Sequence, residues 1–278
     1  MKRSALSLLV ALLSACSGTG NLAFTVYGED FIEDRIPAGE EGVVDGWTIT
    51  FDRFLVTVAE ITVAGADGEV AARQPTPKLF NLKQPGPVPV ERFTELPSQE
   101  YPNISFALAP AKDALPITAS VDDAALMVAG GYSVFVSGEA VRGSERKTFR
   151  WGFTTDTLYE ACEAGDLGAG ATVPDGSDET VQLTIHGDHL FFDHLASDDA
   201  KMRFDAFAAA DKPVTPGGAP DGEITLAELA AVDLTELPAG QYGTGSIANV
   251  NTLRDFVTAQ VRSIGHFRGE GECRPRAR

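Results

Sequence analysis

The chain has 278 residues, of which 40 are Asp or Glu and 22 are Lys or Arg, so its formal net charge is −18. Phosphate contacts require clustered Lys and Arg, and this charge balance therefore excludes nucleic acid as a partner. It also excludes electrostatic docking on anionic lipid headgroups. The length is sufficient for one large domain or two small ones with a sizeable core.

The first sixteen residues have the pattern of a bacterial secretion signal. Lys2 and Arg3 precede an apolar run over residues 5–13, which is too short to cross a bilayer. The run ends in Leu13-Ser14-Ala15-Cys16, which resembles the lipobox of bacterial lipoproteins. The resemblance implies cleavage before Cys16 and attachment of lipid to that cysteine.

This resemblance also predicts where the protein is located. We expect residues 1–15 to be the signal peptide and residues 16–20 a flexible, lipid-anchored tether. Ser17 rather than Asp follows the cysteine, which implies sorting to the outer membrane in a Gram-negative cell. The expected location is the bacterial cell envelope, with contact to the membrane through the lipid. We find no transmembrane span after the signal.

From residue 21 to residue 186 the sequence has the pattern of β-structure. Apolar residues alternate with polar ones in short runs that Gly and Pro separate. Residues 85–102 form a Pro-rich connection. The sequence predicts an antiparallel β-sandwich over residues 21–186, with strands over residues 22–26, 47–63, 70–73, 78–82, 104–108, 132–140, 146–153 and 181–185.

After residue 186 the periodicity becomes helical. Helices are predicted over residues 196–210, 225–232 and 249–263, and the last has apolar residues at spacings of three and four. We therefore expect residues 187–278 to form a smaller helical part that packs on the sandwich. The predicted fold class is α+β, mainly β.

The motif Asp221-Gly222-Glu223-Ile224-Thr225-Leu226-Ala227-Glu228-Leu229 resembles the second half of an EF-hand calcium loop. A hard cation requires several oxygen ligands, a Gly at the sharp turn and a bidentate carboxylate at the start of the exit helix. Standard spacing back from Glu228 places Gly217 and Ala219 at the first two ligand positions. Neither residue has a side-chain oxygen.

Asp211 ends the predicted entering helix and offers the missing first ligand, with six more residues than the standard spacing. The resemblance is therefore to an EF-hand with an expanded first half. It implies a calcium site made by Asp211, Asp221 and Glu228, with Glu223 contributing its backbone carbonyl. A single loop of this kind suggests a weak structural site rather than a sensor. The alternative is a degenerate loop that packs without binding calcium.

Three of the four histidines, His186, His189 and His194, lie within nine residues. Imidazole is a preferred ligand of zinc and copper, and neighbouring Asp residues can orient the rings. His266 is a candidate fourth ligand. The alternative is a strand-end turn with packed histidines.

Cys16 is assigned to the lipid, which leaves Cys162 and Cys273. In an oxidising compartment we expect these two to form a disulfide that ties the C-terminal tail to the middle of the chain. Closing so long a loop stabilises the fold by about 4–5 kcal/mol in the chain-entropy model.

The sequence has no Gly-x-Ser-x-Gly elbow and no phosphate-binding Gly loop after a strand. We therefore expect binding rather than catalysis. The first hypothesis is an envelope lipoprotein with a weak structural calcium site. Its rivals are a zinc- or copper-binding protein that uses the histidines, a metallohydrolase at the same residues, and an envelope protein without a bound ion. No protein partner follows from the sequence.

Overall fold

The computed structural model describes residues 18–212 and 219–278. The predicted signal peptide and the lipobox-like motif with Cys16 lie outside the described residues, so the lipidation stays a prediction. Among the described helices, none is both long enough and apolar enough to cross a membrane.

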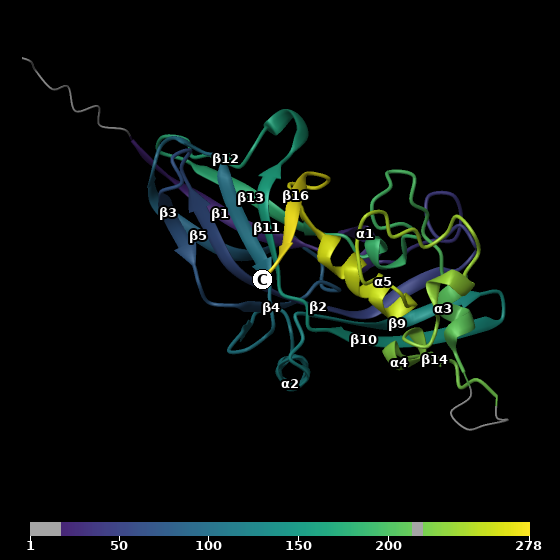
Figure 1. Ribbon diagram of the computed structural model, residues 1–278. Helices are drawn as coiled ribbons and strands as arrows, with labels where there is room; N and C mark the ends of the chain where they lie inside the picture. Colours follow the sequence, from purple (N-terminus) through teal and green to yellow (C-terminus); the bar gives the residue numbers. More distant parts are fainter. Residues whose placement is uncertain (1–17, 213–218) are drawn as a thin grey trace, which may run out of the picture.

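The protein is mainly β and has two principal sheets (Figure 1). The smaller sheet has the order β15 (Gly265–Phe267), β13 (Asp178–Ile185), β1 (Thr19–Tyr27) and β5 (Val88–Pro97). The larger sheet has the order β14 (Glu223–Ile224), β10 (Glu145–Phe153), β9 (Val134–Arg142), β2 (Thr48–Ala64), β7 (Asn103–Leu108), β11 (Thr157–Glu163) and β16 (Glu272–Ala277). β3 (Val70–Gln74) and β4 (Lys78–Asn81) also pair with β2, and β8 (Leu115–Pro116) pairs with β4. A further small sheet joins β12 (Ala171–Thr172) to β6 (Glu100–Tyr101).

The predicted strands are confirmed where alternation and turn residues occur together. β1 buries Leu22, Phe24 and Val26 on one face, as its alternation predicts. β9 and β10 form the predicted hairpin, in which Trp151 lies opposite Val136. β3 returns on β2 across the predicted turn.

The sheets are mixed rather than purely antiparallel, which corrects the prediction. β1 pairs with β13 in parallel, and β10 with β14 and β4 with β8 do the same. A parallel pair needs a long crossover instead of a hairpin. The alternation of β1 and β13 shows which face each strand buries, but it does not encode the direction of their pairing.

Two strands, β5 and the two-residue β6, lie inside the Pro-rich connection, where no strand was predicted. β5 carries Pro89 and Pro97 and pairs only with β1, at the edge of the smaller sheet. An edge strand leaves one row of backbone groups unpaired, so it tolerates residues that lack an N–H. Proline therefore did not exclude a strand at this position.

One large cluster of buried side chains connects the two principal sheets. It contains Phe24 from β1 and Phe51 from β2, and it continues into Phe191 and Phe207 beyond residue 186. Phe51 and Phe191 have ring centroids 6.2 Å apart. Residues on both sides of the expected boundary at residue 186 thus contribute to the same core, and β14, β15 and β16 return the chain to the sheets.

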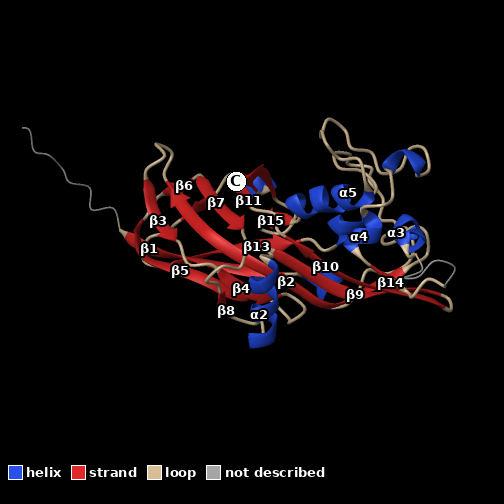
Figure 2. Ribbon diagram, turned by 60° about the horizontal axis from the view of Figure 1, so that its bottom comes forward, coloured by secondary structure: helices blue, strands red, loops and turns tan. Residues whose placement is uncertain are grey.

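The helices are short, and three of them gather near β9, β10 and β14 at one end of the molecule (Figure 2). The α-helices are α1 (Glu29–Glu33), α2 (Val121–Gly130), α3 (Asp205–Ala210), α4 (Leu226–Leu229) and α5 (Leu253–Gln260). The 3₁₀ helices are η1 (Gly165–Leu167), η2 (Asp188–Phe191), η3 (Leu234–Glu236) and η4 (Val261–Ser263).

Two predicted helices begin later than the sequence suggests. Residues 196–204 lie outside α3, and Met202 makes β-bridges to Val43 and Phe192 there. α5 begins after Thr252, whose side chain caps the helix in a box with Asp255. α3 and α4 are 6 and 4 residues long, so the structure does not show the helix–loop–helix of an EF-hand.

Candidate metal centre

Three histidines from separate elements meet at one end of the smaller sheet. His186 directly follows β13, His189 lies in η2, and His266 lies in β15. β13 and β15 pair so that His266 is opposite Thr184, two residues before His186. Sheet pairing therefore brings together side chains that are 80 positions apart in the sequence.

The rings are close enough to share one ion. His186, His189 and His266 each offer a nitrogen, and these nitrogens all lie within 4.8 Å of one another. The ring centroids of His186 and His266 are 4.1 Å apart, and those of His189 and His266 are 4.9 Å apart. A tetrahedral zinc ion holds its nitrogens about 3.4 Å apart, so small rotations of the rings suffice to close the site.

Burial keeps the three imidazoles neutral. It lowers the pKa of His189 to about 3, with the neighbouring His266 and His186 adding to the effect. Burial also lowers the pKa of His186 and of His266 below the ordinary histidine value. Only the neutral ring binds a metal, so these side chains are in the ligand form at neutral pH.

Two ring nitrogens of the cluster are buried without a hydrogen-bond partner, Nε2 of His186 and Nδ1 of His266. A buried polar atom without a partner is costly unless an ion or a water completes it. His189 is held differently, because its Nδ1 lies 3.0 Å from the Ser263 hydroxyl. That contact fixes the orientation of the His189 ring.

Carboxylates surround the histidines on the outer side. Glu29 and Glu270 form a second group with His186 within the same 4.8 Å limit, and a carboxylate oxygen of Glu29 lies 3.5 Å from Nε2 of His186. Burial, Glu270 and Asp188 together raise the pKa of Glu29 to about 7. An open cavity of about 380 Å³ is lined by Glu29, Glu270, Asp30, Tyr27 and Phe31.

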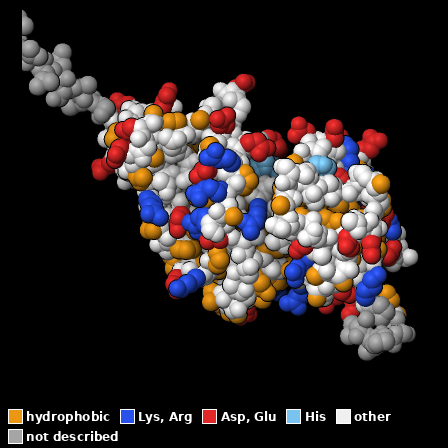
Figure 3. Space-filling view, in the orientation of Figure 1, with side chains coloured by type: hydrophobic (Ala, Val, Ile, Leu, Met, Phe, Trp, Pro, Cys, Tyr) orange, Lys and Arg blue, Asp and Glu red, His pale blue; other side chains and the backbone are white. Residues whose placement is uncertain are grey.

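Asp188 is the aspartate that lies beside a histidine of the cluster, as the sequence suggested. One of its carboxylate oxygens is 3.9 Å from Nδ1 of His186. Burial raises the pKa of Asp188, while His186 opposes that shift. Figure 3 shows histidine side chains beside gathered Asp and Glu on the visible surface. Glu29, Glu270 and Asp188 place carboxylates beside the cluster, and carboxylates attract cations.

The arrangement could hold a metal ion, but His194 does not take part in it. Among the residues that the structure describes, the three-histidine group consists of His186, His189 and His266. Nδ1 of His194 instead accepts the N–H of Ala196, and its ring packs against Gly243. Proximity in the sequence therefore identified two of the three candidate ligands, His186 and His189. The third is His266, which the sequence suggested as an additional ligand.

Sequence reasoning missed Glu29, Glu270 and Ser263. Glu29 is adjacent to Gly28 at the end of β1, and no motif marks it. Ser263 belongs to the predicted last helix, where a serine carries no particular signal. Tertiary packing gives these side chains a role: η4 brings Ser263 to His189, and α1 and the turn between β15 and β16 bring Glu29 and Glu270 to His186.

The carboxylates of the EF-hand-like loop have partners from within the protein. Asp211 accepts hydrogen bonds from the Lys147 ammonium, at 2.7 Å, and from the N–H of Gly222. Glu228 caps α4 through Thr225 and also accepts the N–H of Lys212.

Asp221, the remaining side chain of the predicted calcium site, accepts the N–H of Glu223 in a local turn. Gly222 has a φ of 85°, as the predicted sharp turn requires. In the described part of the chain, Asp211, Asp221 and Glu228 form no group of three ligand atoms of the kind that the histidines form. Calcium binding at this loop stays a prediction.

Cys162 and Cys273 form the predicted disulfide. It links β11 to β16, which are neighbours in the larger sheet. β16 follows β15 after a short turn. The disulfide thus holds the strand that comes directly after the one carrying His266.

The comparisons with known proteins give little further information. No protein-family model matches the sequence, and no curated protein matches it. Among solved structures, MbnP from Methylosinus trichosporium is similar over 73% of this chain and 93% of that chain. The sequence identity is 12% and the TM-score is 0.29, and we base no argument on this similarity. The structure itself shows a mainly β protein with a candidate metal site made of three histidines.

Proposed function

We propose that the protein binds one transition-metal ion, zinc or copper, through His186, His189 and His266. The observation that carries the proposal is a set of three neutral, largely buried imidazoles whose nitrogens lie within 4.8 Å of one another. Two of these rings have a buried nitrogen without a partner. A bound metal ion would complete the coordination of those nitrogens.

The donor set supports zinc or copper rather than a hard cation. Imidazole nitrogen suits zinc and copper, whereas calcium and magnesium require oxygen ligands. The acidic cavity beside His186 favours the approach of a cation from solvent. Glu29 is close enough to provide a further ligand from the outer side. In this proposal the protein acts by holding the metal, not by catalysis.

The signal-like N-terminal sequence supports a location in the bacterial cell envelope. A lipid on Cys16 would hold the protein at the surface of a membrane in the cell envelope, most simply the outer membrane. Thr19 and Gly20, which were predicted as part of a flexible tether, belong to β1, so the described fold would begin close to the lipid-bearing Cys16. The proposal is therefore an envelope-anchored metal-binding lipoprotein.

Metal analysis of protein purified without an affinity tag tests the proposal. We expect one equivalent of zinc or copper, and titration of the metal-free protein with Zn²⁺, Cu²⁺ and Cu⁺ identifies which metal is bound more tightly. His266→Gln removes a ligand and should weaken binding by a hundredfold or more, on the order expected for losing a direct ligand.

His194→Gln is the matched control, because it removes a histidine that lies close in sequence but outside the group. It should bind the metal as tightly as the unaltered protein. The proposal is wrong if the protein binds none of these ions at one equivalent, or if the two variants lose affinity equally.

A further inference from the structure

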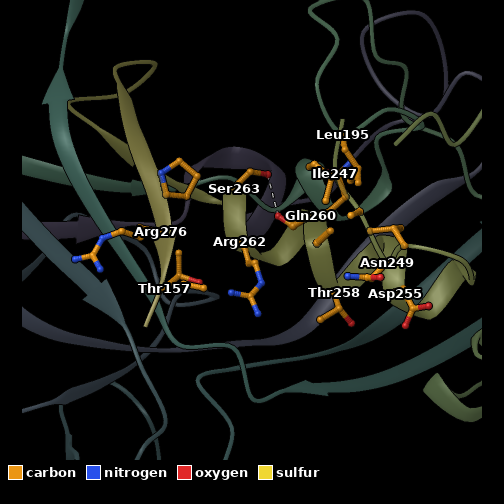
Figure 4. Close-up of a pocket in the computed structure, with 15 residues that line it drawn as sticks. Thr157, Leu195, Ile247, Asn249, Asp255, Thr258, Gln260, Arg262, Ser263 and Arg276 are labelled. Atoms are coloured by element: carbon orange, nitrogen blue, oxygen red, sulfur yellow. Dashed lines mark hydrogen bonds between the residues drawn. The ribbon is translucent and has the colours of Figure 1, made fainter. Parts of the chain in front are cut away.

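A second cavity, of about 470 Å³, lies between α5, η4, β16 and the loop that precedes α5 (Figure 4). Its size is typical of sites for small organic ligands. Part of its wall is apolar, from Leu195, Ile247 and Val250. Ile247 is 45% exposed, a high value for a side chain of this kind.

Arg262 supplies a positive charge in this cavity. Figure 4 shows its side chain between those of Thr157 and Thr258. Among the described residues, no hydrogen bond or ion pair engages the Arg262 guanidinium. The next four arginines in the sequence differ, since each contacts a carboxylate within the protein: Arg268 contacts Glu179, Arg274 and Arg276 contact Glu160, and Arg278 contacts Asp156.

The other charged groups of the cavity are already engaged. Arg276 contacts Glu160 at 3.5 Å. Asp255 accepts the N–H groups of Thr252 and Asn251 at the start of α5. Arg262 is therefore the charged group in the cavity wall that is left for a ligand. Among the described residues, the Arg150 and Arg254 guanidinium groups also lack a hydrogen bond or ion pair, but neither residue lines this cavity. An unpaired guanidinium in the wall of a cavity points to an anionic group that comes from outside.

We propose that this cavity binds a small carboxylate with an apolar chain. The carboxylate would pair with the Arg262 guanidinium, which matches it with two parallel hydrogen bonds. The apolar chain would pack against Leu195, Ile247 and Val250. Thr157 and Thr258 also line the cavity, but the Thr258 hydroxyl already donates to the carbonyl of Arg254 and the Thr157 hydroxyl is buried.

The cavity is a neighbour of the metal centre but a separate site. Ser263 lines the cavity, and its hydroxyl also contacts Nδ1 of His189. A change at Ser263 would therefore disturb both sites. Among the described residues, no hydrogen bond or ion pair joins Arg262 to the three histidines. Arg262 can therefore be substituted without removing a contact of the metal centre.

The test uses octanoate as the probe and octanol as its uncharged counterpart, each titrated into ¹⁵N-labelled protein while amide spectra are recorded. We expect octanoate to give saturable shifts for residues 247–250, 258–263 and 275–277, with a dissociation constant below about 1 mM. Octanol should bind at least about tenfold more weakly, because it cannot form the ion pair.

Arg262→Gln removes the charge and should weaken octanoate binding about tenfold or more, while octanol binding changes little. Arg274→Gln is the matched control, since Arg274 lies in β16 and does not line the cavity. Zinc and copper binding should be the same in both variants, so failure here is distinct from failure of the metal proposal.

Three results would overturn the inference. The first is the lack of saturable shifts with octanoate at about 10 mM, well above the expected dissociation constant. The second is equal binding of octanoate and octanol. The third is equal loss of octanoate binding in Arg262→Gln and Arg274→Gln. An Ala248→Trp variant adds an independent test, because a bulky ring at the rim should block octanoate without removing any charge.

Discussion

The histidine cluster and the EF-hand-like loop both contain the residue types that bind cations, but the fold uses them differently. At the cluster, ring nitrogens of His186 and His266 are buried without a partner. At the loop, the Lys147 ammonium and backbone N–H groups engage Asp211 and Glu228, although Oδ1 of Asp211 is also buried without a partner. Among the described residues, the three imidazole nitrogens converge within 4.8 Å, whereas Asp211, Asp221 and Glu228 form no such group. Residues of the ligand types can therefore hold an ion only where the fold brings several of them together.

The largest expected effect concerns the Lys147 ammonium of β10, which pairs with Asp211 of the EF-hand-like loop. The Asp211 side chain is fully buried and Lys147 is largely buried, so Lys147→Met leaves an uncompensated charge inside the protein. We expect a loss of about 3–5 kcal/mol in the free energy of unfolding, as measured by urea denaturation. Lys212→Met, which changes an exposed lysine next to Asp211, should cost less than about 0.5 kcal/mol. Equal effects in the two variants would show that the buried pair is not what stabilises the loop.

An intermediate effect is expected from pH at the histidine cluster. Burial lowers the pKa of His189 to about 3 in the folded protein, so below about pH 6.5 the unfolded chain binds more protons at this residue than the folded one. The contribution of His189 to the stability of the metal-free protein should therefore fall as the pH falls from about 6.5 to about 5.

Glu29 acts in the opposite direction over the same interval, because its pKa is raised to about 7 in the folded protein. The comparison of unfolding free energies in the unaltered protein and in His189→Gln isolates the histidine contribution. We expect the variant to depend less steeply on pH. An unchanged slope would indicate that His189 is not held in its neutral form by the fold.

The smallest effect is expected from calcium at the loop. If the site binds calcium as weakly as extracellular modules do, a tenfold excess over the dissociation constant stabilises the fold by only about 1.4 kcal/mol. Thermal melting with and without millimolar calcium measures this stabilisation, and Glu228→Ala should abolish it. A shift that persists in Glu228→Ala would assign the effect to another site. Lys147 already pairs with Asp211, so calcium would have to compete with it for this carboxylate. A stabilisation by calcium of more than about 1.4 kcal/mol would indicate that this competition does not occur.

Local pattern was sufficient for eight of the sixteen described strands and for the disulfide. The alternation of Leu22, Phe24 and Val26 predicts which side of β1 is buried, because successive side chains of a strand point to opposite faces. Cys162 and Cys273 were the remaining cysteines once Cys16 had been assigned to the lipid. Proline in β5 misled the prediction, since the sequence does not show that this strand lies at an edge.

The candidate metal centre was predictable only in part. His186 and His189 are close in sequence, and the turn after β13 keeps them close in space. His194 has the same proximity in sequence, yet its ring packs on Gly243. The helix predicted over residues 196–210 forms only over residues 205–210, because Met202 makes β-bridges before it.

By itself, the sequence determined the mainly β class, half of the described strands, the cysteine pair and the set of residues able to bind a cation. These properties depend on residue type and on spacing over a few positions. The tertiary structure decided which of those residues form a site. It brought His266 to His186 through the pairing of β13 with β15, and it placed Lys147 against Asp211. Both contacts join residues more than 60 positions apart, and no local pattern records whether a buried polar atom finds a partner at that distance.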